Sequence, residues 1–522
     1  MAYSKALWRM PLFKRPPVSL GPFGGGLNAS NDPSKIASNE LQDVDNFDIG
    51  TDGVLISRPP IAILATGPTA GTTTEVLGYY KTSAGANQLI VSKGIAGSTA
   101  TTGVYWYNGG SWTLIANIAC RVVVQYNGLL WIIGETTAGG YWDGATYTTV
   151  ASMPIGGCAV VYKDRLFVGA GYRSTTNTSR ITFSNPGDPT LWTSTDFIDI
   201  AKGDGQKVND LYVQGNNVYI FKDDSTYVFS YDAAPTNGTL NKISSLIGTA
   251  ETSCVAEWQG LIFVYHENDV YELNNYVYTR ISIKPKLTPG YTGTNFYFKP
   301  ASLSVLGDRL VVSYFDKVYV YHLLLKAWTT WVSSLGTFGK FWQEPMSAYS
   351  YLYPKYFAGS AVSGTNNVYS FYDTYSSGNS ESMVCSITTK NFDFGDPSYY
   401  KKLLGWNLDI LSTSSVMGSV TPVVYGQSIT WSQAQAFTWA SRLSGGYIWN
   451  LMSTALTSIS QSVLAAGTMA RKLLKFTGAL RFRSIYFTIS TTVTGVSSDS
   501  PVKLFEITPV IAQKEYVNKA VN

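Results

Sequence analysis

The sequence predicts an all-β protein: a β-propeller of about seven blades with an extended N-terminal arm and a C-terminal β-sandwich-like domain. Three observations predict this fold: a hairpin pattern repeated in the middle of the chain, a composition suited to β-sheet, and a change of pattern near residue 375. We expect an arm over residues 1–70, a propeller over 71–374 and a C-terminal β-rich domain over 375–522.

The repeated pattern is two apolar runs on either side of a two-residue turn. It occurs in four segments, 157–170, 208–223, 253–266 and 301–315. Their turn pairs are Lys163-Asp164, Gly215-Asn216, Gln259-Gly260 and Gly307-Asp308. Gly, Asn and Asp tolerate the positive φ that tight hairpin turns need. A hairpin every 45 to 50 residues, roughly, is typical of propeller blades, which bury their faces by stacking around an axis.

The blades are expected to begin near Gly71. The first has strands at 76–80, 88–92 and 103–115, and the second spans 120–134 and 140–150, with a turn at Asn127-Gly128. After the four repeated hairpins, an irregular last unit covers about 339–373. Aromatic outer strands such as Val318-Tyr319-Val320-Tyr321 would fill the space between sheets. A stacking platform for single-stranded nucleic acid is disfavoured because few Lys or Arg are interleaved.

The composition points to β-sheet with a weakly charged surface. Charged residues make up 14% of the chain and aromatic residues another 14%, against roughly 25% charged residues in an average soluble domain. Such a surface fits extensive subunit contacts, and it also fits an ordinary secreted β-protein. The net charge of +4 gives no signature of nucleic-acid binding. From Tyr375 onward there are 12 Lys and Arg against 7 Asp and Glu, so only the C-terminal part is mildly basic.

The cysteines and histidines predict neither a disulfide framework nor a metal centre. The four cysteines, Cys120, Cys158, Cys254 and Cys385, are far apart and favour buried free thiols. The two histidines are His266 and His322, and a zinc site would need more nitrogen or sulfur ligands. The N-terminus lacks the apolar core of a secretory signal, and no window is apolar enough for a spanning helix. We therefore expect assembly in the cytoplasm.

The C-terminal domain is expected to be a sandwich. Alternating strands are predicted over 386–394, 404–410, 420–425, 437–440, 481–490 and 501–510. Between Ile410 and Ala470 only Arg442 is charged, which favours contact with another surface, either a subunit interface or the host cell envelope. A one-sided helix is predicted in this stretch because four apolar residues lie four apart: Leu451, Ala455, Ile459 and Val463. The basic residues from Arg471 to Arg483 fit a solvated face or a DNA-facing rim.

Residues 22–60 carry a resemblance to a known family. Its motifs are Gly25-Gly26-Leu27-Asn28, Asp32-Pro33, Asn39-Glu40-Leu41, Val44-Asp45-Asn46-Phe47, Gly53-Val54-Leu55 and Arg58-Pro59. This segment resembles the opening of the tail nozzle and packaged-DNA stabilisation (tail tubular) proteins of short-tailed bacteriophages. The resemblance implies a virion tail protein that forms a ring, of six copies, which retains double-stranded DNA and conducts it at ejection without reading its sequence.

The resemblance also implies partners, namely adaptor or ring proteins and the fibre or spike proteins of the tail. Transient contact with the cell envelope is an open alternative. By itself, the arm fits either a disordered leader or a segment packed on the propeller or on a neighbouring subunit.

The sequence predicts no catalytic, cofactor or metal site. A GxSxG nucleophile elbow is absent, Gly24-Gly25-Gly26 opens no phosphate loop, and Asp43-Val44-Asp45 matches a calcium loop weakly. Four carboxylates could still converge at blade turns: Asp210, Asp223, Asp224 and Glu251. The alternative function is a polysaccharide-binding adhesin or depolymerase, whose candidate sugar platforms are Trp192, Trp258, Trp328 and Trp331.

Overall fold

A computed structural model describes the fold of most of the chain. The described residues are 13–14, 19–58, 61–68, 74–93, 103–171, 176–249, 252–285, 287, 302–314, 317–333, 335, 338–343, 355–360, 367–372, 381, 383–394, 401–411, 416–425, 453–455, 459–463, 470–482, 484–493 and 503–513. Apart from one 3-10 turn at Pro235–Asn237, every regular element in them is a β-strand. No helix among them has the length and apolar character needed to cross a membrane.

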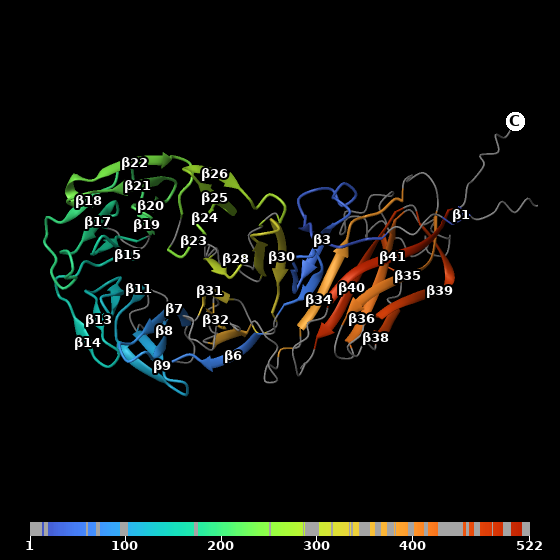
Figure 1. The fold of residues 1–522 in the computed structure, drawn as a ribbon, viewed down its shortest axis with the longest axis horizontal. Helices are drawn as coiled ribbons and strands as arrows, with labels where there is room; N and C mark the ends of the chain where they lie inside the picture. Colours follow the sequence, from blue (N-terminus) through green and yellow to red (C-terminus); the bar gives the residue numbers. More distant parts are fainter. Residues whose placement is uncertain are drawn as a thin grey trace, which may run out of the picture. The chain divides into compact units, whose positions relative to one another are not determined.

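Two compact units make up the chain. One contains Pro59–Lys326 and Thr330–Glu381, and the other contains Met1–Arg58, Ala327–Thr329 and Ser382–Asn522. The first unit is a seven-bladed β-propeller, whose sheets lie around a central axis in Figure 1. The sequence predicted about seven blades, and the structure confirms that number.

Each of the first six blades consists of four strands that follow one another in the chain, and in the first five blades these strands form a separate four-stranded antiparallel sheet. The first blade contains β7 (Thr74–Lys81), β8 (Asn87–Lys93), β9 (Gly103–Tyr107) and β10 (Trp112–Ala116). The second contains β11 (Cys120–Tyr126), β12 (Leu129–Gly134), β13 (Gly140–Trp142) and β14 (Tyr147–Thr149). The third contains β15 (Cys158–Tyr162), β16 (Arg165–Gly169), β17 (Arg180–Phe183) and β18 (Phe197–Asp199). The fourth blade contains β19 (Val208–Gln214), β20 (Asn217–Lys222), β21 (Thr226–Ser230) and β22 (Thr239–Ser244). The fifth contains β23 (Val255–Trp258), β24 (Leu261–His266), β25 (Asp269–Asn274) and β26 (Val277–Arg280). The sixth contains β27 (Ser302–Leu306), β28 (Arg309–Tyr314), β29 (Lys317–His322) and β30 (Ala327–Trp331).

The seventh blade joins the two ends of the propeller sequence. Its strands β31 (Phe338–Gln343), β32 (Lys355–Ser360) and β33 (Asn367–Tyr372) are completed by β6 (Ile61–Thr66), which pairs antiparallel with β33. Ile61 is fully buried in this blade. The propeller therefore starts at β6, inside the segment that we expected to belong to the arm, because a strand from before the first blade closes the ring.

The predicted hairpin turns have the expected geometry. Lys163 and Asp164 have φ of 46° and 57°, and they connect the paired residues Tyr162 and Arg165. Gln259 and Gly260, at 49° and 84°, do the same in the fifth blade. Positive φ at both central residues matches the twist of the flanking strands. The turn pairs thus fix the register of the two inner strands of a blade.

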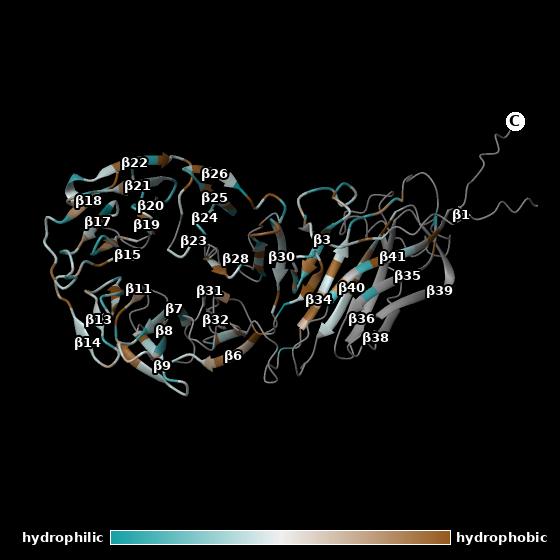
Figure 2. Ribbon diagram, in the orientation of Figure 1, coloured by the Kyte–Doolittle hydropathy of each residue, from teal (hydrophilic) through white to brown (hydrophobic). Residues whose placement is uncertain are grey.

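Apolar side chains fill the spaces between neighbouring blades. Between the third and fourth blades, Phe167 packs with Phe183 and Phe229, at ring-centroid distances of 5.5 and 6.5 Å. Hydrophobic residues occur within the strands of blades around the whole ring in Figure 2. The predicted role of the aromatic strands, packing between twisted sheets, is confirmed at these positions.

The second unit is β-sandwich-like and holds two sheets. One has the strand order β39 (Ala470–Phe482), β35 (Lys401–Leu411), β41 (Lys503–Gln513), β5 (Leu55–Ser57) and β4 (Phe47–Ile49), with β1 (Phe13–Lys14) on β41. The other contains β3 (Glu40–Asp45), β34 (Met383–Thr389), β40 (Ser484–Val493), β36 (Val416–Tyr425) and β37 (Ser453–Ala455), with β2 (Gly26–Leu27) on β3 and β38 (Ile459–Val463) on β36.

The described residues before Pro59 form part of this second unit. Leu20 and Phe23 are fully buried, and the carboxylate of Glu40 accepts hydrogen bonds from Asn28 Nδ2 and from the backbone N–H of Ala37, at 2.8 and 2.9 Å. Short strands that complete sheets begun elsewhere in the chain carry little periodicity of their own, which is why the segment looked irregular.

The one-sided helix predicted from Leu451 to Val463 is wrong where the structure describes this stretch. Residues 453–455 and 459–463 form strands β37 and β38, which pair with β36. Residues four apart share a face on a helix, but even spacings also share a face on a strand. Four of the predicted C-terminal strands overlap β34, β35, β36 and β41. The predicted strand 481–490 instead spans the end of β39 and most of β40, and 437–440 lies outside the described residues.

Candidate functional site at the propeller axis

The first strand of each blade lies at the axis, and these strands bring distant charged residues together. Neighbouring first strands contact one another around the ring, as in β15 with β19, β27 with β31 and β31 with β7. Asp210 on β19, Lys340 on β31 and Glu75 on β7 are all half-buried. The charges of Asp210 and Glu75 both act on Lys340. The fourth, seventh and first blades therefore supply one charged cluster.

Asp210 is held by backbone donors from two blades. The chain is irregular between Val208 and Asp210, where the pairing with β20 shifts register. One carboxylate oxygen accepts from the N–H of Leu211 at 2.9 Å, and the other accepts from the N–H of Ser253 at 3.2 Å. The Thr252 hydroxyl beside it lies 2.9 Å from the carbonyl of Asn209. These bonds connect the fourth blade to the start of the fifth.

Burial shifts the ionisation of both charged partners towards neutrality. It raises the pKa of Asp210 to about 6, although the Lys340 charge and the two backbone donors oppose the shift. It lowers the pKa of Lys340, and the negative charges of Asp210, Cys254 and Glu75 oppose that shift. Desolvation disfavours the charged form of an acid and of a base alike.

The axial cluster offers acid–base or small-ion chemistry. Perturbed ionisation marks functional sites in many proteins, although structural ion pairs also show it. Asp210 and Lys340 are close enough for their charges to interact, and they lie on the first strands of the fourth and seventh blades. We regard this pair first as a structural link across the axis. Sequence reasoning missed it because nothing in the sequence signals that β19 and β31 meet.

The four carboxylates singled out from the sequence do not form one site. Asp223 accepts from the N–H of Lys207 at 2.7 Å and from Asn209 Nδ2 at 2.9 Å, so it stabilises a loop. Asp210 faces different partners at the axis, and Asp224 is exposed in the turn after β20. Glu251 lies outside the described residues. The expected calcium-like pair, Asp43 and Asp45, lies on strand β3.

A second buried charge, which the sequence did not suggest, lies in the fourth blade. Lys222 has no exposed surface, and its Nζ lies 2.7 Å from both carboxylate oxygens of Asp204. It also donates to the carbonyl of Ile200 at 2.9 Å. A buried ammonium needs such partners because desolvation costs several kcal/mol per ion. This ion pair supports the loop before β19.

The tryptophans, cysteines and second histidine have mainly structural surroundings. Trp328 and Trp331 are buried, and Trp192 and Trp258 are half-buried. Trp192 packs against the core between the second and third blades and donates to the carbonyl of Pro189. All four cysteines are buried free thiols, as predicted, and His322 is buried as well. Burial raises the pKa of Cys120 and Cys158, which keeps these thiols protonated.

The chain is similar in structure to solved propeller-like proteins. No family model and no curated protein matches the sequence. The extracellular domain of the hybrid two component system BT4673 from B. thetaiotaomicron matches with a TM-score of 0.43 and 12% identity, over 61% of this chain and 40% of that one.

Two smaller proteins match a similar share of the chain. The computationally designed Ika8 protein matches with a TM-score of 0.36 and 10% identity, over 60% of this chain and 99% of its own. The Pan2 WD40 domain of Neurospora crassa matches with a TM-score of 0.36 and 8% identity, over 60% of this chain and 89% of its own.

Proposed function

We propose that this protein is a structural component of a bacteriophage tail, a ring-forming nozzle subunit that retains packaged double-stranded DNA and conducts it at ejection. The observation that carries the proposal is the resemblance of residues 22–60 to the opening of tail nozzle proteins. Two residues of that segment, Asn46 and Arg58, form a buried hydrogen-bonded corner of the second unit. These two residues of the resembling motifs are therefore part of the folded core, whereas Asp32-Pro33 is exposed.

The DNA channel in this proposal lies between subunits. Within one subunit, Asp210, Lys340 and Cys254 lie close enough near the axis to interact electrostatically. A lumen enclosed by several copies would leave the propeller intact. A net charge of +4 over 522 residues suits a conduit wall, since neutralising many phosphates would hold the DNA in place.

The proposed ring needs large surfaces for neighbouring subunits and other tail proteins. Between Ile410 and Ala470 the sequence contains a single charged residue, Arg442. Subunit interfaces are depleted of charged residues at their centres. We assign this stretch to contacts within the tail, with six copies in the ring and with adaptor and fibre or spike proteins as neighbours, in a virion assembled in the host cytoplasm.

The test is the assembly state of the purified full-length chain. Electron microscopy and light scattering are expected to show closed rings of six copies with a central lumen. These rings should persist in high salt, because a weakly charged interface depends little on exposed ion pairs. A monomer at all concentrations, together with sugar release from host polysaccharide, would overturn the proposal and identify a depolymerase instead.

A further inference from the structure

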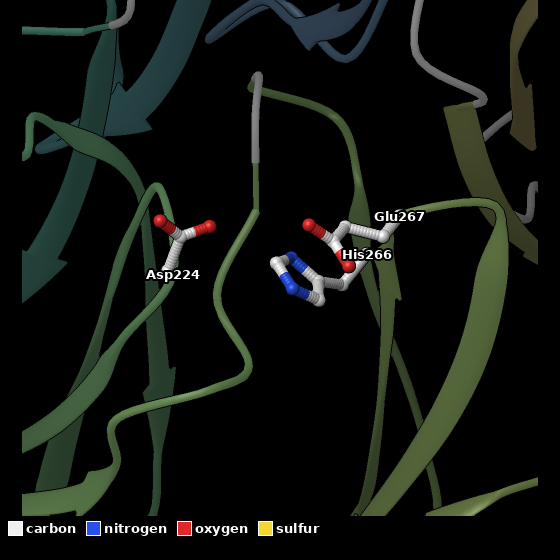
Figure 3. A group of neighbouring side chains, drawn as sticks. All are labelled: Asp224, His266 and Glu267. Carbon is white, nitrogen blue, oxygen red and sulfur yellow. The ribbon is translucent and has the colours of Figure 1, made fainter.

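Three side chains with metal-ligating atoms meet between the fourth and fifth blades. Asp224 comes from the turn between β20 and β21, and His266 and Glu267 come from the end of β24 and the turn that follows it. One ligand atom of each lies within 4.8 Å of the others. In Figure 3 the His266 ring and the Glu267 carboxylate lie together, with the Asp224 carboxylate opposite them.

These side chains have no other hydrogen-bonding role among the described residues. The imidazole of His266 is 6% exposed yet makes no hydrogen bond or ion pair there, and neither do the carboxylates of Asp224 and Glu267. Neither ring nitrogen of His266 is among the fully buried unsatisfied atoms of the described residues, so both remain accessible to a ligand. Two neighbouring carboxylates also repel each other unless a positive charge lies between them. Both facts point to a cation.

We propose that Asp224, His266 and Glu267 bind a divalent transition metal ion of the zinc class and thereby link the two blades. Zinc accepts imidazole nitrogen and carboxylate oxygen at about 2.0–2.2 Å. Atoms bound to one ion are then at most about 4.4 Å apart, so a small movement of the exposed Asp224 and Glu267 side chains brings the three into range. Water completes the coordination.

The mixed ligand set selects the class of metal. Calcium prefers six to eight oxygen ligands, roughly, whereas imidazole suits zinc and its neighbours. The sequence argument expected no metal site because it counted nitrogen and sulfur ligands alone. Two carboxylates complete the set here: Glu267 follows His266 in the sequence, and Asp224 comes from the neighbouring blade, which only the fold brings to His266. This inference is independent of the proposed role in a phage tail.

Titration of the full-length protein with metal tests the site. After chelator treatment and dialysis, calorimetry with ZnCl₂ is expected to show one Zn²⁺ per chain, and saturation should raise Tm because the ion binds the folded state. Co²⁺ is expected to give the visible absorption of a coordinated ion. The exposed ligand variants D224N and E267Q should each weaken Zn²⁺ binding at least about tenfold.

Asp232 provides the matched control. Asp232 follows β21, the third strand of the fourth blade, which also carries Asp224. Its side chain is fully exposed, and D232N removes one negative charge, as D224N does. D232N should bind Zn²⁺ as the wild type does, and Ca²⁺ should bind the wild type at least about tenfold more weakly than Zn²⁺. The proposal is overturned if millimolar Zn²⁺ does not bind, if binding survives both D224N and E267Q unchanged, or if Ca²⁺ binds equally well.

Discussion

Asn46 is the residue at which the chain passes from strand β3 in one sheet to strand β4 in the other. Its φ of 62° makes the turn. Its side-chain oxygen accepts from Arg58 Nε at 2.7 Å, and its nitrogen donates to the carbonyl of Val384 at 2.8 Å. Arg58 is fully buried. One asparagine therefore supplies both the backbone geometry and a partner for a buried charge.

Asn46→Ala is expected to lower the free energy of unfolding by about 2–5 kcal/mol. Alanine is strained at positive φ by roughly 1–2 kcal/mol, and loss of a partner for a buried charged group adds about 1–3 kcal/mol. Urea unfolding measures the change. Asn177→Ala is the control, because Asn177 has a similar φ of 50° but is exposed. Equal losses in the two variants would show that the buried contacts of Asn46 contribute nothing.

Asp210 gives the propeller a pH dependence of defined sign. Its pKa of about 6 in the folded state lies above the usual 3.8, so the folded protein binds the proton more tightly than the unfolded chain does. This group's contribution to stability is therefore full at low pH and is lost as pH rises from about 4 to 6. The loss is on the order of 3 kcal/mol.

Asp210→Asn is expected to remove that decline. Urea midpoints measured from pH 4 to 7 should fall less steeply in the variant than in the wild type. Asp143 provides the opposite sign, because the N–H groups of Thr146 and Ala145 hold its pKa below the usual value. Ionisation of Asp143 as pH rises therefore stabilises the folded state, and Asp143→Asn should remove this gain in stability. Parallel curves for Asp210→Asn and wild type would contradict the assignment of the raised pKa to Asp210.

At the scale of elements, β6 is the strand that closes the propeller. Ile61 is fully buried against a cluster that includes Trp331, Phe338 and Tyr369, and its N–H donates to Glu381 at 2.7 Å. Ile63, on the same strand, is 47% exposed. Ile61→Ala should lower the free energy of unfolding by about 2–5 kcal/mol, and Ile63→Ala by less than about 1 kcal/mol. Similar losses would show that β6 is not packed as described.

Elements made of local signals could be predicted from the sequence, and those completed by distant strands could not. The turn at Gln259-Gly260 and its flanking apolar runs lie within a few residues of one another, so the hairpin is readable. Strand β6 pairs with β33 from the far end of the propeller, and Leu55–Ser57 joins β41 near the C-terminus. No local pattern records such pairings, and for that reason the sequence argument did not assign β6 to a blade.

The same limit applies to the charged sites. Asp210 and Lys340 meet because the ring brings the fourth and seventh blades to one axis. Asp224 and His266 meet because consecutive blades stack side by side. The blade count follows from a repeat, but a site between blades depends on which turn faces which. That information appears only when the whole ring is built.

At the scale of the whole molecule, ring closure predicts where the propeller can be cut. A fragment of residues 59–381 keeps β6, whereas a fragment of residues 71–381, which starts near the boundary read from the sequence, lacks it. Without β6 the edge of β33 is open and the site of Ile61 is unfilled. Open strand edges promote aggregation. The shorter fragment should melt at lower temperature and aggregate more than the longer one.

The two fragments differ only by residues 59–70, so the comparison isolates the effect of the closing strand. Circular dichroism melting and size-exclusion chromatography measure the difference, and the loss should exceed the roughly 2–5 kcal/mol expected for Ile61→Ala, because an entire strand ladder is removed as well. A peptide of residues 59–70 added to the shorter fragment should restore part of the lost stability by pairing with β33. Equal melting temperatures without the peptide would mean that the seventh blade holds the ring closed with three strands, and that β6 only covers its edge.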